Sequence, residues 1–166
     1  VNKSSLPKVY GGFNTSLSWK GFDLSAIFAY SIGGYIYNRD ITMILHNGSL
    51  EGRDWSTEIL KRWTPENRYT DVPALSTTSN NWNSASTRFL QNNSYMRLKN
   101  LTLSYDLPKQ WISKLALSSV QVFVQGDNLF TIHRNQGLDP EQGITGITYY
   151  RYPAMRTISG GINLSF

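Results

Sequence analysis

Cysteine is absent from the 166 residues, which excludes a disulfide framework and a cysteine-ligated metal site. Charged residues are also scarce, at 16% against about a quarter in ordinary soluble domains. No apolar run approaches the ~18 residues that a transmembrane helix needs, and no signal-peptide pattern is present. The formal charge of +5 comes from scattered basic residues, so we expect no nucleic-acid interface.

Aromatic residues make up 13% of the chain, and they occur together with many Asn, Ser and Thr residues. This composition favours a single all-β domain over residues 1–166. The last nine residues, "ISGGINLSF", show the pattern: Ile158, Ile162, Leu164 and Phe166 share one parity, and small polar residues occupy the other. Because side chains alternate between the faces of a strand, this segment is expected to have one apolar and one polar face.

Five antiparallel strands are predicted from this alternation, at about 12–19, 22–31, 95–106, 118–129 and 154–166. Lys20-Gly21 indicates a two-residue hairpin, and Pro108 is placed to start one helical turn. Long connections are expected at about 32–94 and 131–153. The first of these is predicted to carry two short helices, within 38–48 and 54–67, with Asp40 and Asp54 as N-caps.

Strand length and connection length favour a transmembrane barrel. The strands have about the nine to eleven residues that a tilted strand needs to cross a bilayer, and short connections alternate with long ones. On this interpretation Leu24, Val122 and Ile162 face lipid. A row of aromatic residues is then expected at one membrane interface, formed by Trp19, Phe22, Tyr105 and Phe166. Five strands cannot close such a barrel, because bacterial barrels start at about eight.

The stretch from 94 to 141, which contains "NLFT" at 128–131 and "GLDPE" at 137–141, resembles the carboxy-terminal barrel of the SusC/RagA family of TonB-dependent outer-membrane transporters. "YGGFNTSLSWKGFDLSAIFAYSIGG" and "KRWTPENRYTD" are similar to preceding strands and an outer loop of that family. The similarity covers the whole chain, but only about the last fifth of such a transporter.

The resemblance implies a barrel of about 22 strands with a plug in its lumen, located in the bacterial outer membrane and surrounded by its lipid. Such a transporter imports an oligosaccharide or peptide ligand beneath a SusD-like lipoprotein. It would contact TonB through an amino-terminal part that lies outside this chain. The resemblance implies neither an enzyme nor a cofactor. It also implies that Phe166, Leu164 and Ile162 form a barrel-assembly signal, which the assembly machinery reads by strand addition.

Three tryptophans in the expected outer loop could contact ligand or lid, because sugar rings stack on aromatic faces. Trp55 and Trp63 share a face of the predicted helix, which favours burial of that face over ligand contact. Trp82 lies in a polar stretch and is the better candidate for an exposed contact.

The other chemistry-bearing residues form no recognisable catalytic or metal site. His46 and His133 are far apart and are expected to be solvated loop residues. Asp139 and Glu141 flank Pro140. We expect a turn there, in which the Asp139 side chain accepts a hydrogen bond from a nearby backbone amide. The alternative to a transporter is a secreted, soluble β-sandwich that binds glycans, in which Leu24, Val122 and Ile162 would pack against an opposing sheet.

Overall fold

The computed structural model of the chain describes residues 2–46, 48, 50, 52–76, 78, 82, 84–113, 117–135, 137–141 and 145–166. In these residues the strands are β1 (Val9–Trp19), β2 (Phe22–Ile32), β3 (Tyr35–Asn38), β4 (Leu90–Asn92), β5 (Tyr95–Asp106), β6 (Ser119–His133), β7 (Ile147–Thr148) and β8 (Thr157–Ser165). The helices are α1 (Arg39–Ile44), α2 (Lys109–Ile112) and two 3-10 turns, η1 (Thr57–Lys61) and η3 (Thr87–Phe89).

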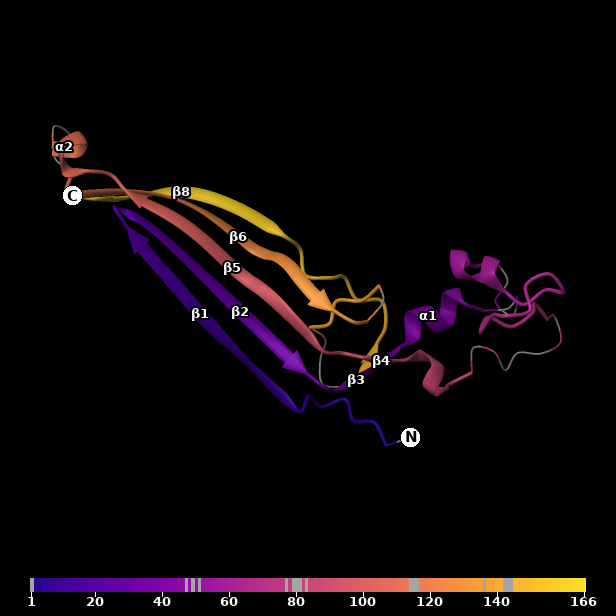
Figure 1. Cartoon of the computed structure of the whole chain (residues 1–166). Helices are drawn as coiled ribbons and strands as arrows, with labels where there is room; N and C mark the ends of the chain where they lie inside the picture. Colours follow the sequence, from indigo (N-terminus) through magenta and orange to yellow (C-terminus); the bar gives the residue numbers. More distant parts are fainter. Residues whose placement is uncertain are drawn as a thin grey trace.

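A single antiparallel sheet of five strands in the order β1-β2-β5-β6-β8 forms the body of the chain. The hairpin turn, α2 and the C-terminus lie at one end of this sheet, and the long loops and the N-terminus lie at the other (Figure 1). No second layer covers the five strands in the part of the chain that the structure describes. The fold class is therefore the open antiparallel sheet that was predicted, and the two-sheet sandwich is not what is observed.

The hairpin between β1 and β2 forms as the sequence predicts. Lys20 and Gly21 both adopt positive φ angles, 47° and 87°, which is the backbone of the tight turn whose twist matches a β-hairpin. Trp19 consequently pairs with Phe22. A Cβ on Gly21 would lie 3.2 Å from the carbonyl oxygen of Asp106, so the turn also needs glycine for its close approach to β5.

The two faces of the sheet differ row by row. Paired residues of neighbouring strands share a face, so the register defines complete rows across the five strands. One row consists of Leu17, Leu24, Leu103, Val124 and Gly160. The adjacent row, on the opposite face, consists of Ser16, Ser25, Thr102, Gln125 and Ser159. In these two rows the predicted segregation into an apolar and a polar face extends across all five strands.

The apolar face has no protein layer against it among the described residues. Leu24, Val122 and Ile162 remain 39%, 43% and 63% exposed. A soluble sandwich would bury these side chains in its core, so their exposure contradicts that alternative.

Three of the four aromatic residues expected at one interface share a row. Trp19 pairs with Phe22, which pairs with Tyr105, and the rings of Phe22 and Tyr105 lie 4.4 Å apart. Ile162 continues this row on β8 through Val122. Phe166 lies four positions beyond Ile162, at the α2 end of the sheet (Figure 1).

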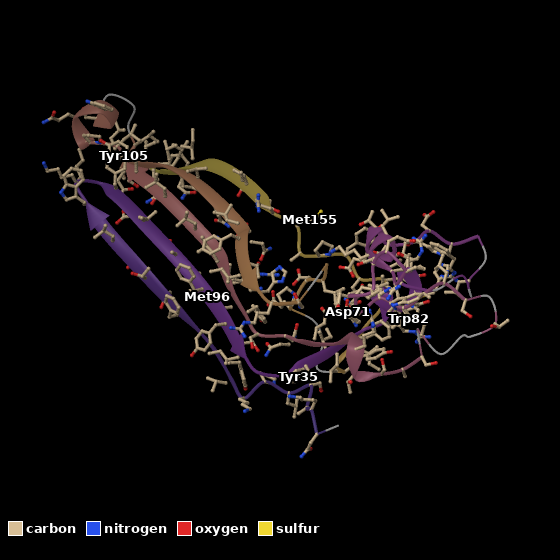
Figure 2. The ribbon with its side chains drawn as sticks, turned by 45° about the vertical axis from the view of Figure 1, so that its right-hand side comes forward. Tyr35, Asp71, Trp82, Met96, Tyr105 and Met155 are labelled. Atoms are coloured by element: carbon tan, nitrogen blue, oxygen red, sulfur yellow. The ribbon has the colours of Figure 1, made fainter. Side chains whose placement is uncertain are left out.

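Most of the deeply buried apolar side chains lie beyond the other end of the sheet, whereas Leu98 of β5 and Ile112 of α2 are buried elsewhere. A small sheet in the order β4-β3-β7 connects the long loops at that other end, and the sequence pattern did not reveal these short strands. Its surroundings bury Ile36, Leu45, Ile59, Val72 and Phe89 to 5% exposure or less. Figure 2 shows Asp71 and Trp82 in this loop body, whereas Tyr105 lies at the opposite end, near α2.

Two short helices occur in the first long connection, but their capping residues differ from those predicted. The side chain of Asn38, rather than Asp40, caps α1 by accepting from the Ile41 amide. Ser56, rather than Asp54, caps η1. In each case the residue with extended backbone just before the first turn holds the acceptor, as N-capping requires.

Candidate functional site at the loop end of the polar face

An irregularity in β5 places an arginine on the polar face. Ile27 pairs with Asn100 and Phe28 pairs with Leu98, so Lys99 is an extra residue relative to β2. A bulge of this kind resets the alternation of side chains. Leu98 consequently joins the apolar face, and Arg97 joins the polar face opposite Thr131 of β6.

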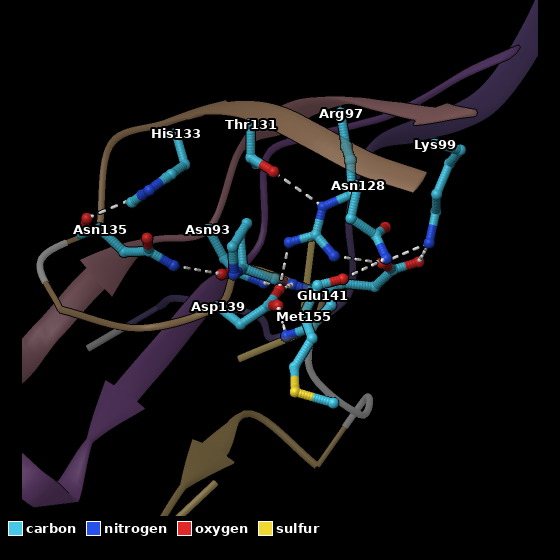
Figure 3. A network of polar contacts seen from close by, with 12 residues as sticks. Asn93, Arg97, Lys99, Asn128, Thr131, His133, Asn135, Asp139, Glu141 and Met155 are labelled. Atoms are coloured by element: carbon cyan, nitrogen blue, oxygen red, sulfur yellow. Dashed lines mark hydrogen bonds and ion pairs between the residues drawn. The ribbon is translucent and has the colours of Figure 1, made fainter. Parts of the chain in front are cut away.

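Arg97 binds the loop that connects β6 to β8, and this is the network shown in Figure 3. Its guanidinium lies 2.5 Å from an Asp139 carboxylate oxygen and 2.8 Å from one of Glu141. Its Nε donates to the Thr131 hydroxyl at 2.8 Å. Lys99 forms a second ion pair with Glu141, at 2.5 Å. We call Arg97, Lys99, Thr131, Asp139 and Glu141 the loop anchor.

The ion pair at the centre of the loop anchor is buried. The side chains of Arg97 and Asp139 are only 4% and 6% exposed. Burial alone would raise the pKa of Asp139, but hydrogen bonds from the Ala154 amide, Arg97 and the Glu141 amide outweigh it and lower the pKa. Asp139 is therefore held as a carboxylate. The predicted turn at 139–141 is confirmed, since Asp139 accepts from the Glu141 amide at 2.9 Å.

A second set of hydrogen bonds fixes the start of the same loop. Asn93 donates to the carbonyl oxygen of Pro140 at 2.9 Å, and Asn135 donates to the side-chain oxygen of Asn93 at 3.0 Å. The Nδ1 atom of His133 lies 2.9 Å from the carbonyl oxygen of Asn135. The connection after β6 is thus tied to the segment just before β5, 42 residues away for the pair Asn93 and Asn135.

Two clefts flank the Arg97–Asp139 pair. One, of about 450 Å³, is lined by residues that include His133, Pro153 and Arg156. The other, of about 250 Å³, is lined by residues that include Glu141, Arg151 and Tyr152. Both clefts therefore open beside residues 149–156 of the β6–β8 loop.

The three tryptophans proposed for ligand or lid contact lie in the loop body but not on one helical face. The 3-10 turn η1 spans only Thr57–Lys61, so Trp55 and Trp63 lie outside it and the shared helical face was wrong. Trp82, expected to be the most exposed, is partly covered, whereas Trp55 and Trp63 are exposed. The indole N–H of Trp82 donates to the carbonyl oxygen of Leu45, and the Arg88 guanidinium lies 3.7 Å from the centroid of the Trp82 ring.

Only one of the two histidines is solvated as expected. His46 is 1% exposed, and its Nδ1 accepts the N–H of Trp55 at 3.1 Å; the expectation of a solvated residue was wrong because the loop body packs around it. His133 is exposed but ends strand β6. Among the described residues, no three His, Asp or Glu side chains are grouped closely enough to hold a metal ion.

Two residues of the expected assembly signal, Ile162 and Leu164, lie on the apolar face of β8, and Phe166 follows the last residue of this strand. Ile162, Leu164 and Phe166 are 63%, 53% and 93% exposed. Ile162 and Leu164 pair with Val122 and Val120 of β6. Among the strands that the structure describes, none pairs with the other edge of β8.

Comparison with known proteins gives relatives of one kind. The chain is 33% identical over 166 residues to TonB-dependent receptor P3 of Formosa agariphila, covering 93% of this chain and 16% of the receptor. It is 30% identical to TonB-dependent receptor P26 of the same organism, covering 98% and 17%. It is 27% identical to TonB-dependent receptor SusC of Bacteroides thetaiotaomicron, covering 100% and 16%.

Solved structures agree. The RagAB peptide importer in its closed-closed state matches the whole chain with a TM-score of 0.88 and 35% identity, over 18% of that chain. Its open-open state matches with a TM-score of 0.89. No protein-family model matches the chain. Within the described residues, no helix is long and apolar enough to cross a membrane. The chain spans about a sixth of the length of the relatives that it matches.

Proposed function

Because the chain belongs to the SusC/RagA group of TonB-dependent receptors, which are outer-membrane proteins, we propose that its five strands form part of the wall of a nutrient importer. The complete receptor takes up an oligosaccharide or a peptide, and this segment supplies wall and outer loops. We expect no catalytic activity from it. Strands outside this segment close the barrel.

One observation carries this proposal: the separation of apolar and polar rows in a sheet that no second layer covers within the described residues. Every backbone group in hydrocarbon must be hydrogen-bonded, and a closed sheet achieves this. The strands of the sheet have 9 to 15 residues, enough to cross ~30 Å of hydrocarbon at a tilt. The apolar face therefore meets lipid and the polar face lines the lumen.

The orientation follows from the connections. The two-residue turn at Lys20-Gly21 and the α2 turn lie at one end of the sheet, which we assign to the periplasmic side. The long loops at the other end are then extracellular. A SusD-like lipoprotein would cover these loops, and TonB would act through a part of the receptor outside this chain.

Uptake by cells tests the proposed function. Cells that lack the complete receptor are compared with cells that carry it on a plasmid, using labelled pools of oligosaccharides and peptides. We expect receptor-dependent uptake of at least one pool, and we expect it to stop when TonB is absent. If neither pool enters more slowly in receptor-deficient cells, the proposed function is wrong.

The barrel-assembly signal stays part of this proposal. Leu164 and Ile162 project from the apolar face of β8, and Phe166 follows this strand directly. Among the described strands the second edge of β8 has no neighbour, which suits recognition by strand addition. Replacing Phe166 with serine should lower the amount of folded receptor in the outer membrane. Ser165→Ala, on the opposite face, is the matched control. Equal membrane levels for both variants would contradict the signal.

Contact between the outer loops and the ligand or lid is also proposed for Trp55, Trp63 and Trp82. The exposure of Trp55 and Trp63, at 42% and 44%, supports a docking role for these two. Leu45 and Arg88 cover part of Trp82, so this residue could contact the ligand or lid only through the uncovered part of its ring. We expect Trp63→Ala to weaken lipoprotein capture in detergent, with the exposed Leu60→Ala as a control of similar location; unchanged capture would argue against the contact.

A further inference from the structure

Residues 149–156, with the sequence YYRYPAMR, form an exposed strip between β7 and β8, which we call the tyrosine–arginine strip. Tyr150, Tyr152 and Met155 are 65%, 97% and 81% exposed. Arg151 and Arg156 are exposed as well. Large aromatic and cationic side chains thus face outward along the whole strip.

The backbone of the strip is nevertheless fixed at three points. The Tyr150 amide donates to the Asp40 carboxylate at 3.0 Å. The Ala154 amide donates to the Asp139 carboxylate at 2.6 Å, and Asn128 donates to the Met155 carbonyl oxygen at 3.2 Å. A backbone that is already anchored loses little freedom on binding, which is one advantage of a preorganised site.

The backbone conformation of Tyr150 also favours a binding site at this strip. Its φ angle is +49°, a left-handed backbone that is costly for a bulky residue and that clusters at binding sites. The Asp40 bond holds this conformation. The ring of Tyr150 lies 4.2 Å from that of Tyr149, and Arg39 lies 4.8 Å from the Tyr149 ring.

The charges of the strip are free to meet a ligand. Within the described part of the chain, neither Arg151 nor Arg156 forms an ion pair, whereas Arg97, which lines the same clefts, is matched by Asp139 and Glu141. Arg151 and Arg156 line the two clefts on either side of that pair. The arrangement offers two guanidinium groups and neighbouring tyrosine rings over the polar face.

From this placement we infer that the tyrosine–arginine strip binds an acidic oligosaccharide, with a carboxylate of the sugar on Arg151 or Arg156 and a sugar ring against Tyr152. The inference rests on the proposed import function. Guanidinium groups bind carboxylates through paired N–H donors, and the flat, exposed tyrosine rings fit the C–H face of a sugar. A bound peptide would use a free strand edge or side-chain pockets. The strip is not a strand, and the cleft that contains Arg151 and Tyr152 is lined largely by charged and polar groups.

Binding to the complete purified receptor tests the inference, with calorimetry as the readout. The probes are a galacturonic acid tetrasaccharide, a neutral glucose tetrasaccharide and an acidic octapeptide. We expect the galacturonate probe to bind more tightly than the other two. Arg151→Gln and Tyr152→Leu should each weaken its binding roughly five- to fiftyfold, and added salt should weaken it further.

Matched controls are Arg68→Gln and Tyr69→Leu, which change exposed residues of the same types in the other long loop. The inference is overturned if the galacturonate probe does not bind, if the acidic peptide binds more tightly, or if the control variants weaken binding as much as the strip variants. A receptor that imports another nutrient but fails this test overturns only the inference. The loss of all receptor-dependent uptake would overturn the proposed function instead.

Discussion

Replacing Arg97 with methionine removes the cation at the centre of the loop anchor while keeping most of the side-chain volume. Asp139, whose side chain is 6% exposed, would then lose its ion pair at 2.5 Å. Removing one partner of a buried pair costs about 3–5 kcal/mol. Asp139 keeps the amides of Glu141 and Ala154, so we take the lower end, about 3 kcal/mol, which corresponds to a roughly hundredfold increase in loop opening.

Hydrogen exchange of the complete receptor measures this opening. Peptides that cover 137–141 and 145–156 should exchange roughly a hundredfold faster in Arg97→Met, because the unmatched Asp139 carboxylate makes the closed loop less stable. The hairpin of β1 and β2 should be unchanged. Arg151→Met is the control, since it removes an exposed arginine from the same loop without touching the buried pair.

A second substitution separates charge from packing. Adding Asp139→Asn to Arg97→Met removes the unmatched carboxylate but keeps one oxygen, which can accept one of the two amides that bond different carboxylate oxygens in the wild type. We expect this double variant to recover part of the lost protection. The reasoning is refuted if Arg97→Met exchanges like the wild type, or if the double variant opens more readily than Arg97→Met.

Three further outcomes are expected. The pKa of Asp139 is lowered in the folded loop. The ionised carboxylate therefore stabilises the loop above the ordinary aspartate pKa of about 3.9, and this stabilisation is lost as the pH falls through the lower pKa of the folded state. Proteolysis of the β6–β8 loop should stay constant down to about pH 4 and then accelerate, and acceleration near pH 6 would contradict this. Gly21→Ala should destabilise the hairpin by about 1 kcal/mol or more, because φ is +87°; an unchanged denaturant midpoint would argue against the turn geometry. Thr148 is fully buried and its Oγ1 has no hydrogen-bond partner among the described residues, so Thr148→Val should be neutral or stabilise by up to about 1 kcal/mol; faster exchange of β3 in this variant would show that the hydroxyl is needed.

The large sheet could be predicted because its determinants are local. Alternation of side chains identifies each strand, and Lys20-Gly21 specifies the hairpin from two residues. A local irregularity also explains why the alternation of apolar and polar side chains breaks on the N-terminal side of Leu101. The extra residue Lys99 shifts the parity, so Arg97 lies on the polar face although a regular strand would place it on the other.

The candidate site could not be predicted because its partners are distant in sequence. Arg97 lies 42 residues from Asp139 and 44 from Glu141, and no local pattern announces the pairing. The strands β3, β4 and β7 have only two to four residues each, too few for periodicity. His46 is buried by this loop body, so its environment also depends on tertiary packing.

The central claim is that one face of the sheet meets lipid and the other meets water. The most direct test measures, for each side chain along β5, whether it is exposed to lipid or to water. Spin labels are placed one at a time at positions 101 to 105 of the complete receptor in a bilayer, and collisions with oxygen and with a water-soluble nickel chelate are measured. The account predicts that labels at Leu101, Leu103 and Tyr105 meet oxygen in lipid, while those at Thr102 and Ser104 meet the nickel chelate. Equal accessibility at all five positions, or the opposite phase, would contradict it.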